Sequence, residues 1–201
     1  MEKFIFVAGG SFQGKSMVAL RIAAQFKFSG VLTTDMIRNF HNINDSSNEV
    51  FSTSTYLMKP EDFNRQKEKV SDSLKKIMEI YRFRGEKMIF EGVHFSDQFI
   101  RSIKDTEYLK IFINNKISPK ERFEYKKKTR SNFSYLDNET RTYEHTTYFE
   151  HEQRMMQIHE DLKKVCVENN FTVIDYTDIN EAFMQCEELV DNYLNNAFRR
   201  S

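Results

Sequence analysis

Short apolar runs alternate along this chain with longer segments in which apolar residues recur at helical spacing. Five runs have the length of a strand and are rich in β-branched or aromatic side chains. They cover residues 4–8, 30–34, 87–90, 108–113 and 171–174. A run that is apolar on both faces is typical of a parallel strand covered by helices on both sides. The pattern therefore predicts five buried strands.

Helical spacing dominates the segments between these runs. Residues 17–26, 60–83 and 118–128 are predicted helices, as are the segments on either side of the last strand. Three of these helices show clear apolar faces: Val70, Leu74, Ile77, Met78 and Tyr81; Met155, Ile158, Leu162 and Val165; and Ala182, Phe183, Cys186, Leu189, Val190 and Tyr193. Residues 41–55 are rich in Asn, Ser and Thr without periodicity, so we expect a loop. Strands that alternate with helices predict an α/β fold, here a three-layer α/β/α arrangement with a mainly parallel five-stranded sheet.

Composition narrows the class of protein. The 201 residues suffice for one α/β domain, so residues 1–201 are predicted to form a single domain. Thirty Lys and Arg residues balance thirty Asp and Glu residues, so any anion site must be local, and a general binder of nucleic acid or of an anionic membrane is disfavoured. No apolar run has the length of a membrane span or a signal-peptide core. Cys166 and Cys186 are interpreted as buried side chains on helix faces, and we expect a reducing, cytoplasmic location.

The strongest motif follows the first strand. Residues Gly9–Ser16 match G-x-x-x-x-G-K-[ST], and a predicted helix begins directly after them. In such a phosphate-binding loop (P-loop), backbone N–H groups and the helix N-terminus face a phosphate chain. The Lys reaches the β- and γ-phosphates and the Ser hydroxyl ligates Mg²⁺. We therefore predict a nucleotide site made by Gly9, Gly10, Ser11, Phe12, Gln13, Gly14, Lys15, Ser16 and Met17. The alternative, a glycine turn between core elements, would leave Lys15 at a helix start, where the dipole disfavours a cation.

Two further strand ends carry candidate chemistry. Asp35 and Arg38 follow the second strand and share one helix face, so they can address an anionic acceptor; the alternative is an N-cap Asp with a surface Arg. Glu91 ends the third strand, where a carboxylate is costly unless it meets a metal, water or partner. His94 follows in the same loop and is a weaker candidate. Because ligands bind at the carboxyl ends of strands in such sheets, these residues are predicted to form one site with the P-loop.

A basic run lies between the fourth and fifth strands. Residues 116–130 hold seven cationic and two anionic side chains, a net charge of +5, and lead into a polar segment. Such a run is usually a solvated helix face, but a mobile arginine-bearing lid over polyphosphate would exclude water from phosphoryl transfer. We predict a lid over approximately residues 118–146, with Arg122 and Arg130 as its principal arginines and Arg141 behind them. His145, His151 and His159 lack zinc-site spacing and are interpreted as surface or packing residues.

These motifs together resemble those of the 2-phosphoglycerate kinase family of P-loop kinases. The similarity rests on Gly9–Ser16, on residues 34–38, on the Glu-Gly-Val-His tetrapeptide at 91–94, and on Glu121-Arg122-Phe123 with Arg130. It extends through Tyr143, Phe149, Ile158 and Leu162 to about residue 175. The tetrapeptide is the most specific element. The resemblance implies a sheet flanked by helices with a lid, ATP and Mg²⁺, and a small phosphorylated hydroxy acid as acceptor.

The sequence as a whole favours an ATP-dependent phosphotransferase that acts on a hydroxyl of a small anionic metabolite. Lys15, Asp35, Glu91 and Arg130 are the predicted catalytic residues, and Ser16 and Glu91 the predicted metal ligands. Acceptor binding is assigned to Asp35, Arg38, Glu91, His94, Arg122 and Arg130. Two alternatives remain open: a nucleoside or polynucleotide 5′-hydroxyl kinase, for which no base-stacking platform is evident, and a nucleotide-binding protein with weak catalysis. The sequence leaves open which carboxylate orients the hydroxyl.

Overall fold

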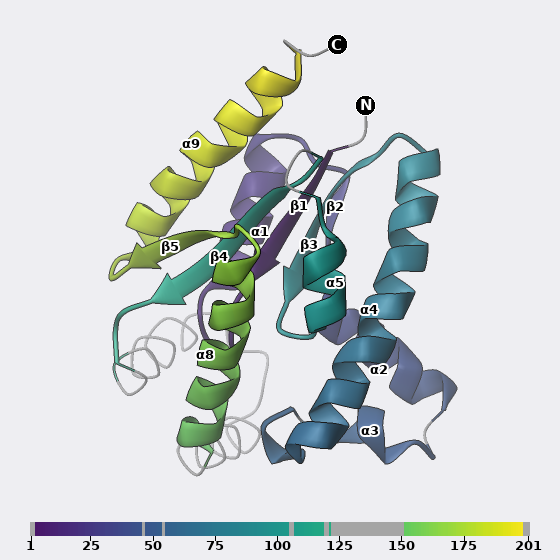
Figure 1. The fold of residues 1–201 in the computed structure, drawn as a ribbon. Helices are drawn as coiled ribbons and strands as arrows, with labels where there is room; N and C mark the ends of the chain where they lie inside the picture. Colours follow the sequence, from purple (N-terminus) through teal and green to yellow (C-terminus); the bar gives the residue numbers. More distant parts are fainter. Residues whose placement is uncertain are drawn as a thin grey trace, which may run out of the picture.

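Five parallel strands form the centre of the molecule, in the order β2-β3-β1-β4-β5 (Figure 1). The computed structural model describes residues 3–45, 47–53, 55–104, 107–118, 121 and 151–198. The strands are β1 (Lys3–Ala8), β2 (Gly30–Thr33), β3 (Lys87–Gly92), β4 (Leu109–Asn115) and β5 (Thr172–Tyr176). Every pairing between neighbouring strands is parallel. The predicted sheet is confirmed, and all its carboxyl ends meet at one edge.

Helices cover both faces of this sheet (Figure 1). One face packs against α1 (Lys15–Gln25) and α9 (Ile179–Phe198). The other packs against α4 (Pro60–Phe83), α5 (Asp97–Ser102) and α8 (Glu152–Glu168), with α2 (Thr34–Asn44) and α3 (Glu49–Ser52) beside α4. The three-layer α/β/α arrangement is therefore confirmed.

The alternation of side chains along β1 shows why two helical layers are needed. Phe4 and Phe6 point into one core and Ile5 and Val7 into the other, all completely buried. The Phe6 ring lies within 6.1 Å, centroid to centroid, of four other aromatic rings. Because neither face of β1 could be exposed to water without losing this burial, the strand is fixed at the centre of the sheet.

The segment predicted as a loop at residues 41–55 is largely helical, so that prediction is wrong. Helix α2 continues to Asn44, α3 follows, and a 3₁₀ turn covers Thr55–Leu57. Phe51, with Val50 beside it, packs α3 against the core, and this burial outweighs the low helix propensity of the surrounding Asn and Ser residues. Helix α5 was also missed; it is only six residues long, too short for a periodic signal.

Cys166 and Cys186 are free thiols and fully buried, as predicted. The side chains of Ser118 and Glu121 hydrogen-bond each other and both backbone N–H groups, a capping box at the start of the predicted helix. The rest of that helix and the proposed lid lie outside the described residues. None of the described helices is long and apolar enough to span a bilayer.

Candidate functional site

The P-loop connects the end of β1 to the start of α1. Gly14 occupies the N-cap position with φ 78°, and no described side chain caps the helix. The first N–H groups of α1 are therefore available to an anion. Lys15 Nζ donates to the Gly10 carbonyl at 2.8 Å, which folds the ammonium over the loop. Phe12 has φ 61° and packs with Tyr56 against Met155, a contact that compensates for an unfavourable backbone conformation.

The strands β4 and β5 hold the loop from its other side. The Gln13 side chain is buried, and its Oε1 accepts a hydrogen bond from the Asn115 backbone N–H at 2.7 Å. The Tyr176 hydroxyl donates to the Gln13 carbonyl at 2.8 Å. The Gln13 side chain thus anchors the loop, and the backbone N–H is what this residue can offer a phosphate.

Ser16 and Glu91 meet next to the loop. The Ser16 hydroxyl donates to Glu91 Oε1 at 2.9 Å, because β3 neighbours β1 and Val7 is in register with Glu91. Glu91 is only 4% exposed, and its Oε2 has no hydrogen-bond partner among the described residues. An unpaired buried carboxylate oxygen is costly. A hydroxyl beside a carboxylate is an oxygen donor set that suits Mg²⁺, which needs only one or two protein carboxylates when phosphates complete its shell.

Asp35 and Arg38 lie together at the start of α2, as predicted. Their side chains approach to 3.7 Å. The Asp35 side chain is 62% exposed, whereas Arg38 is mostly buried and its Nε has no hydrogen-bond partner within the described part of the chain. The helix is capped by Thr33, whose hydroxyl accepts from the Met36 N–H at 3.0 Å. Asp35 is therefore not the N-cap but an acidic residue of the first turn, paired with Arg38, and its role toward the acceptor stays a prediction.

His94 is completely buried behind this pair. Its Nδ1 lies 3.0 Å from Thr34 Oγ1 and its Nε2 lies 3.1 Å from Thr55 Oγ1. Asp35 Oδ1 is 3.7 Å from Nδ1. Burial, the main cause, lowers the pKa of His94 to about 4, so the ring is neutral near pH 7. The geometry favours a role in positioning the threonines and Asp35, and direct acceptor binding stays a prediction.

The glycine of the Glu-Gly-Val-His tetrapeptide has a steric role. A Cβ on Gly92 would lie 1.8 Å from Thr34 Oγ1. Only a residue without a side chain lets β3 approach the start of α2 this closely. Gly92 thereby allows Glu91 and Asp35 to lie at the same rim.

The other residues singled out in the sequence analysis differ in burial and in position. Ser11 is partly buried and Met17 is 52% exposed. Arg122, Arg130, Arg141 and His145 lie outside the described residues. His151 stacks on Tyr56, and His159 is buried against the P-loop. Five residues support the site from behind and were not predicted: Thr34, Thr55, Asn114, Asn115 and Tyr176. Polar residues at strand ends and in helices match no sequence motif, so no local pattern indicated their role.

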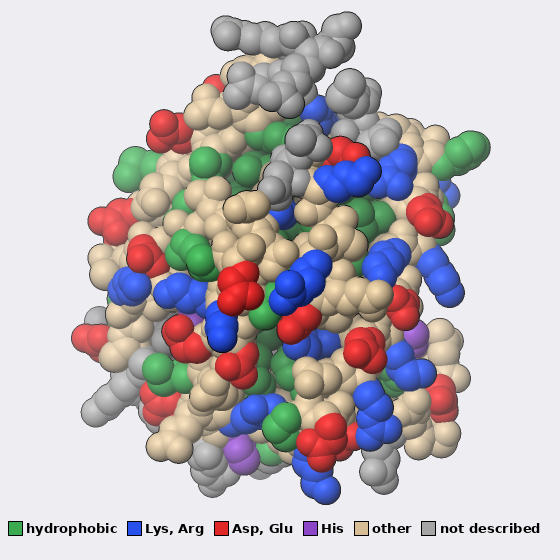
Figure 2. All heavy atoms as spheres, viewed as in Figure 1, with side chains coloured by type: hydrophobic (Ala, Val, Ile, Leu, Met, Phe, Trp, Pro, Cys, Tyr) green, Lys and Arg blue, Asp and Glu red, His purple; other side chains and the backbone are tan. Residues whose placement is uncertain are grey.

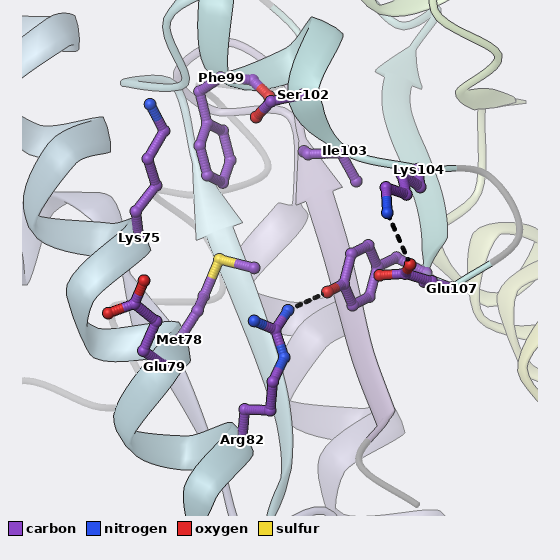
Figure 3. A pocket seen from close by; sticks show the side chains of 10 residues that line it. Lys75, Met78, Glu79, Arg82, Phe99, Ser102, Ile103, Lys104 and Glu107 are labelled. Carbon is purple, nitrogen blue, oxygen red and sulfur yellow. Dashed lines mark hydrogen bonds and ion pairs between the residues drawn. The ribbon is translucent and has the colours of Figure 1, made fainter.

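A hollow of about 490 Å³ lies between α4 and α5 (Figure 3). Tyr108 precedes β4, so this hollow is near the amino ends of the strands, away from the P-loop. Its Lys104 pairs with Glu107, and its Arg82 bonds the Tyr108 hydroxyl.

Figure 2 shows acidic and basic side chains interspersed over the face of the molecule in view. Among the described residues no group of three or more His, Cys, Asp and Glu could hold a metal.

Comparisons with known proteins agree with this architecture. No protein-family model matches the sequence, and no curated protein matches it. A solved structure of shikimate kinase from Acinetobacter baumannii in complex with shikimate is similar with a TM-score of 0.55 at 11% identity, covering 98% of this chain and 95% of that chain. An uncharacterized protein from Eubacterium ventriosum has a TM-score of 0.50 at 9% identity, covering 94% and 98%. Such low identities show the fold alone, and the chain has the α/β fold of P-loop kinases.

Proposed function

We propose that this protein is an ATP-dependent kinase that phosphorylates a hydroxyl group of a small anionic metabolite. One observation carries the proposal: the buried Glu91 carboxylate accepts a hydrogen bond from the Ser16 hydroxyl through Oε1 at the start of the P-loop helix, while its Oε2 has no hydrogen-bond partner among the described residues. A carboxylate with this environment is expected where Mg²⁺ accompanies a nucleotide. The P-loop kinase fold, shared with shikimate kinase, supports the same class of reaction.

The residues divide between the two substrates. The P-loop backbone and Lys15 would bind the ATP phosphates, while Ser16 and Glu91 would hold Mg²⁺, which neutralises phosphate charge when bound. Asp35, whose side chain is 62% exposed, would accept the proton of the acceptor hydroxyl. The hydroxyl oxygen then bonds the γ-phosphorus as the bond to the β-phosphate oxygen breaks, releasing ADP. Glu91, paired with Ser16, is better placed for the metal than for the hydroxyl.

Local charge supports an anionic acceptor. Arg38, Lys15 and Lys67 all lower the pKa of buried His94, although Lys67 is also paired with Asp97 and Arg38 with Asp35. The buried Arg38 Nε offers a donor to a phosphate or carboxylate. We extend the proposal to a phosphorylated hydroxy acid such as 2-phosphoglycerate, in line with the sequence resemblance, with Arg122 and Arg130 contributing from the lid.

The test is a screen for acceptor-dependent ADP release with hydroxy acids, phosphorylated hydroxy acids, nucleosides and 5′-hydroxyl oligonucleotides. Lys15→Ala should lower turnover by roughly 10²-fold or more, since it removes a preorganised charge from the transferring phosphate. The matched control is Lys76→Ala, an exposed lysine on α4, which should behave as wild type. Phosphorylation of oligonucleotides alone would overturn the metabolite proposal. ATP binding without turnover on any acceptor would indicate a binding protein instead.

A further inference from the structure

A histidine far along the chain holds the backbone of the P-loop. The Gly10 N–H donates to His159 Nδ1 at 3.0 Å, across 149 residues of sequence. His159 lies on α8 and is only 6% exposed. Because a backbone N–H can only donate, Nδ1 must be the unprotonated nitrogen, and Nε2 carries the ring proton. The neutral ring is therefore fixed in one tautomer.

The hydrogen bonds continue from this ring to the ends of β4 and β5. His159 Nε2 lies 3.0 Å from Asn114 Oδ1 and donates to it. The Asn114 amide in turn donates to Asp175 Oδ1, and Lys116 forms an ion pair with Asp175 Oδ2 at 3.2 Å. Although partial burial opposes it, the bonds from Asn114 and Lys116 lower the pKa of Asp175. The chain of bonds thus ends on a charged carboxylate, which orients every donor toward it.

Packing leaves the ring little freedom. A Cβ on Gly10 would lie 2.7 Å from His159 Cβ, so the close approach of α8 requires glycine at position 10. On its other side the ring is tilted against Phe112, with 5.0 Å between centroids. The contact between loop and helix is therefore both hydrogen-bonded and sterically matched.

We propose that His159 is a positioning residue that holds the P-loop in its phosphate-binding shape. The inference rests on the proposed nucleotide site. Gly10 is the link: its N–H is fixed by His159, and its carbonyl accepts the Lys15 ammonium at 2.8 Å. Fixing this one residue places both the loop backbone and the lysine before ATP binds. A preorganised site avoids the cost of ordering the loop during binding.

Two substitutions separate the two ends of the ring. In His159→Asn the side-chain oxygen takes the place of Nδ1, so the bond from Gly10 is kept and the bond to Asn114 is lost. In His159→Gln the amide reaches toward Asn114, so the bond from Gly10 is lost. ATP affinity, measured by calorimetry with Mg²⁺, should stay within about 3-fold of wild type for Asn and fall by about 10-fold for Gln, because a buried hydrogen bond contributes about 1.4 kcal/mol. If His159 only stabilised the fold, the two folded variants would bind ATP with the same affinity, whatever their free energies of unfolding.

A second measurement needs no variant. Hydrogen exchange of the Gly10 amide should be slow in the wild-type protein and in His159→Asn, and fast in His159→Gln. Fast exchange in the wild type, or a Gln variant with wild-type affinity, would overturn the role of His159. Lys15→Ala distinguishes the two proposals. If wild type binds ATP and Lys15→Ala does not, the nucleotide site stands whatever His159 does; if neither binds, both proposals fall.

Discussion

Acid should destabilise this protein in part through the buried ring of His94. Burial is the largest cause of its lowered pKa, and Arg38, Lys15 and Lys67 lower it further, while Asp35 opposes them. The pKa is about 4 in the folded protein against 6.5 for an ordinary histidine. Between these values the unfolded chain binds a proton at this position and the folded protein does not. The free energy of unfolding therefore falls as pH is lowered from about 6.5 toward 4.

The size of the effect follows from the two pKa values. They differ by about 2.5, and each tenfold difference in proton affinity corresponds to about 1.4 kcal/mol. The complete loss is therefore about 3 kcal/mol below pH 4, of which about 2 kcal/mol is lost by pH 5. This is a large fraction of the stability of a typical domain.

Urea unfolding of wild type and His94→Gln at several pH values between 7.5 and 5 tests this reasoning. Glutamine does not titrate, so its variant should lose about 2 kcal/mol less than wild type over that range. His151→Gln, at a partly exposed ring that stacks on Tyr56, is the matched control and should follow wild type. If His94→Gln lost stability in parallel with wild type, His94 would not be the buried neutral ring that the structure describes.

Four further substitutions test the site and the packing around it. Glu91→Gln should raise the Mg²⁺ concentration needed for half-maximal activity, whereas Asp35→Asn should lower turnover at saturating Mg²⁺. Steady-state kinetics measures both. If Asp35→Asn changed the Mg²⁺ dependence and Glu91→Gln did not, Asp35 would be the metal ligand and Glu91 would orient the hydroxyl. Arg38→Ala should raise the KM for the acceptor by roughly 10-fold or more, since a charged hydrogen bond contributes about 1.5–3 kcal/mol. The KM for ATP should stay nearly unchanged. A raised KM for ATP with an unchanged KM for the acceptor would show that Arg38 binds the nucleotide instead. Gly92→Ala should destabilise the fold by about 1–3 kcal/mol in urea unfolding, because the added methyl overlaps Thr34; wild-type stability would contradict that packing.

Local sequence patterns were enough to predict most strands and helices of the fold, and to predict that the P-loop and Glu91 lie at the same rim. Strands β1, β3 and β4 are buried on both faces, which could be predicted without the strand order. The edge strands β2 and β5 are only partly buried, so the prediction of five buried strands is wrong for these two. Ser16 meets Glu91 because parallel strands end at the same rim, a rule that holds for any such sheet. The actual neighbour relation, with β1 between β3 and β4, depends on side-chain packing over the whole sheet.

The support behind the site could not be predicted in the same way. His159 bonds a backbone N–H that is 149 residues away, and such a bond leaves no trace in spacing or composition. The prediction of a loop at residues 41–55 failed for a related reason. The burial of Phe51, which stacks on His41 where α3 packs against α2 and α4, determines the local structure, whereas the local composition favours a loop. In both cases tertiary contacts override the local signal.

The strand order also governs how the chain can fold during synthesis. Lys3 of β1 pairs with Lys87 of β3, so about 84 residues must be added before β1 has its first partner. At a synthesis rate of roughly 5–20 residues per second, Phe4 and Phe6 remain unpaired for about 4–17 s. The strand that is most deeply buried in the finished protein is therefore exposed longest on the nascent chain. Its apolar side chains are the expected contact for a ribosome-associated chaperone.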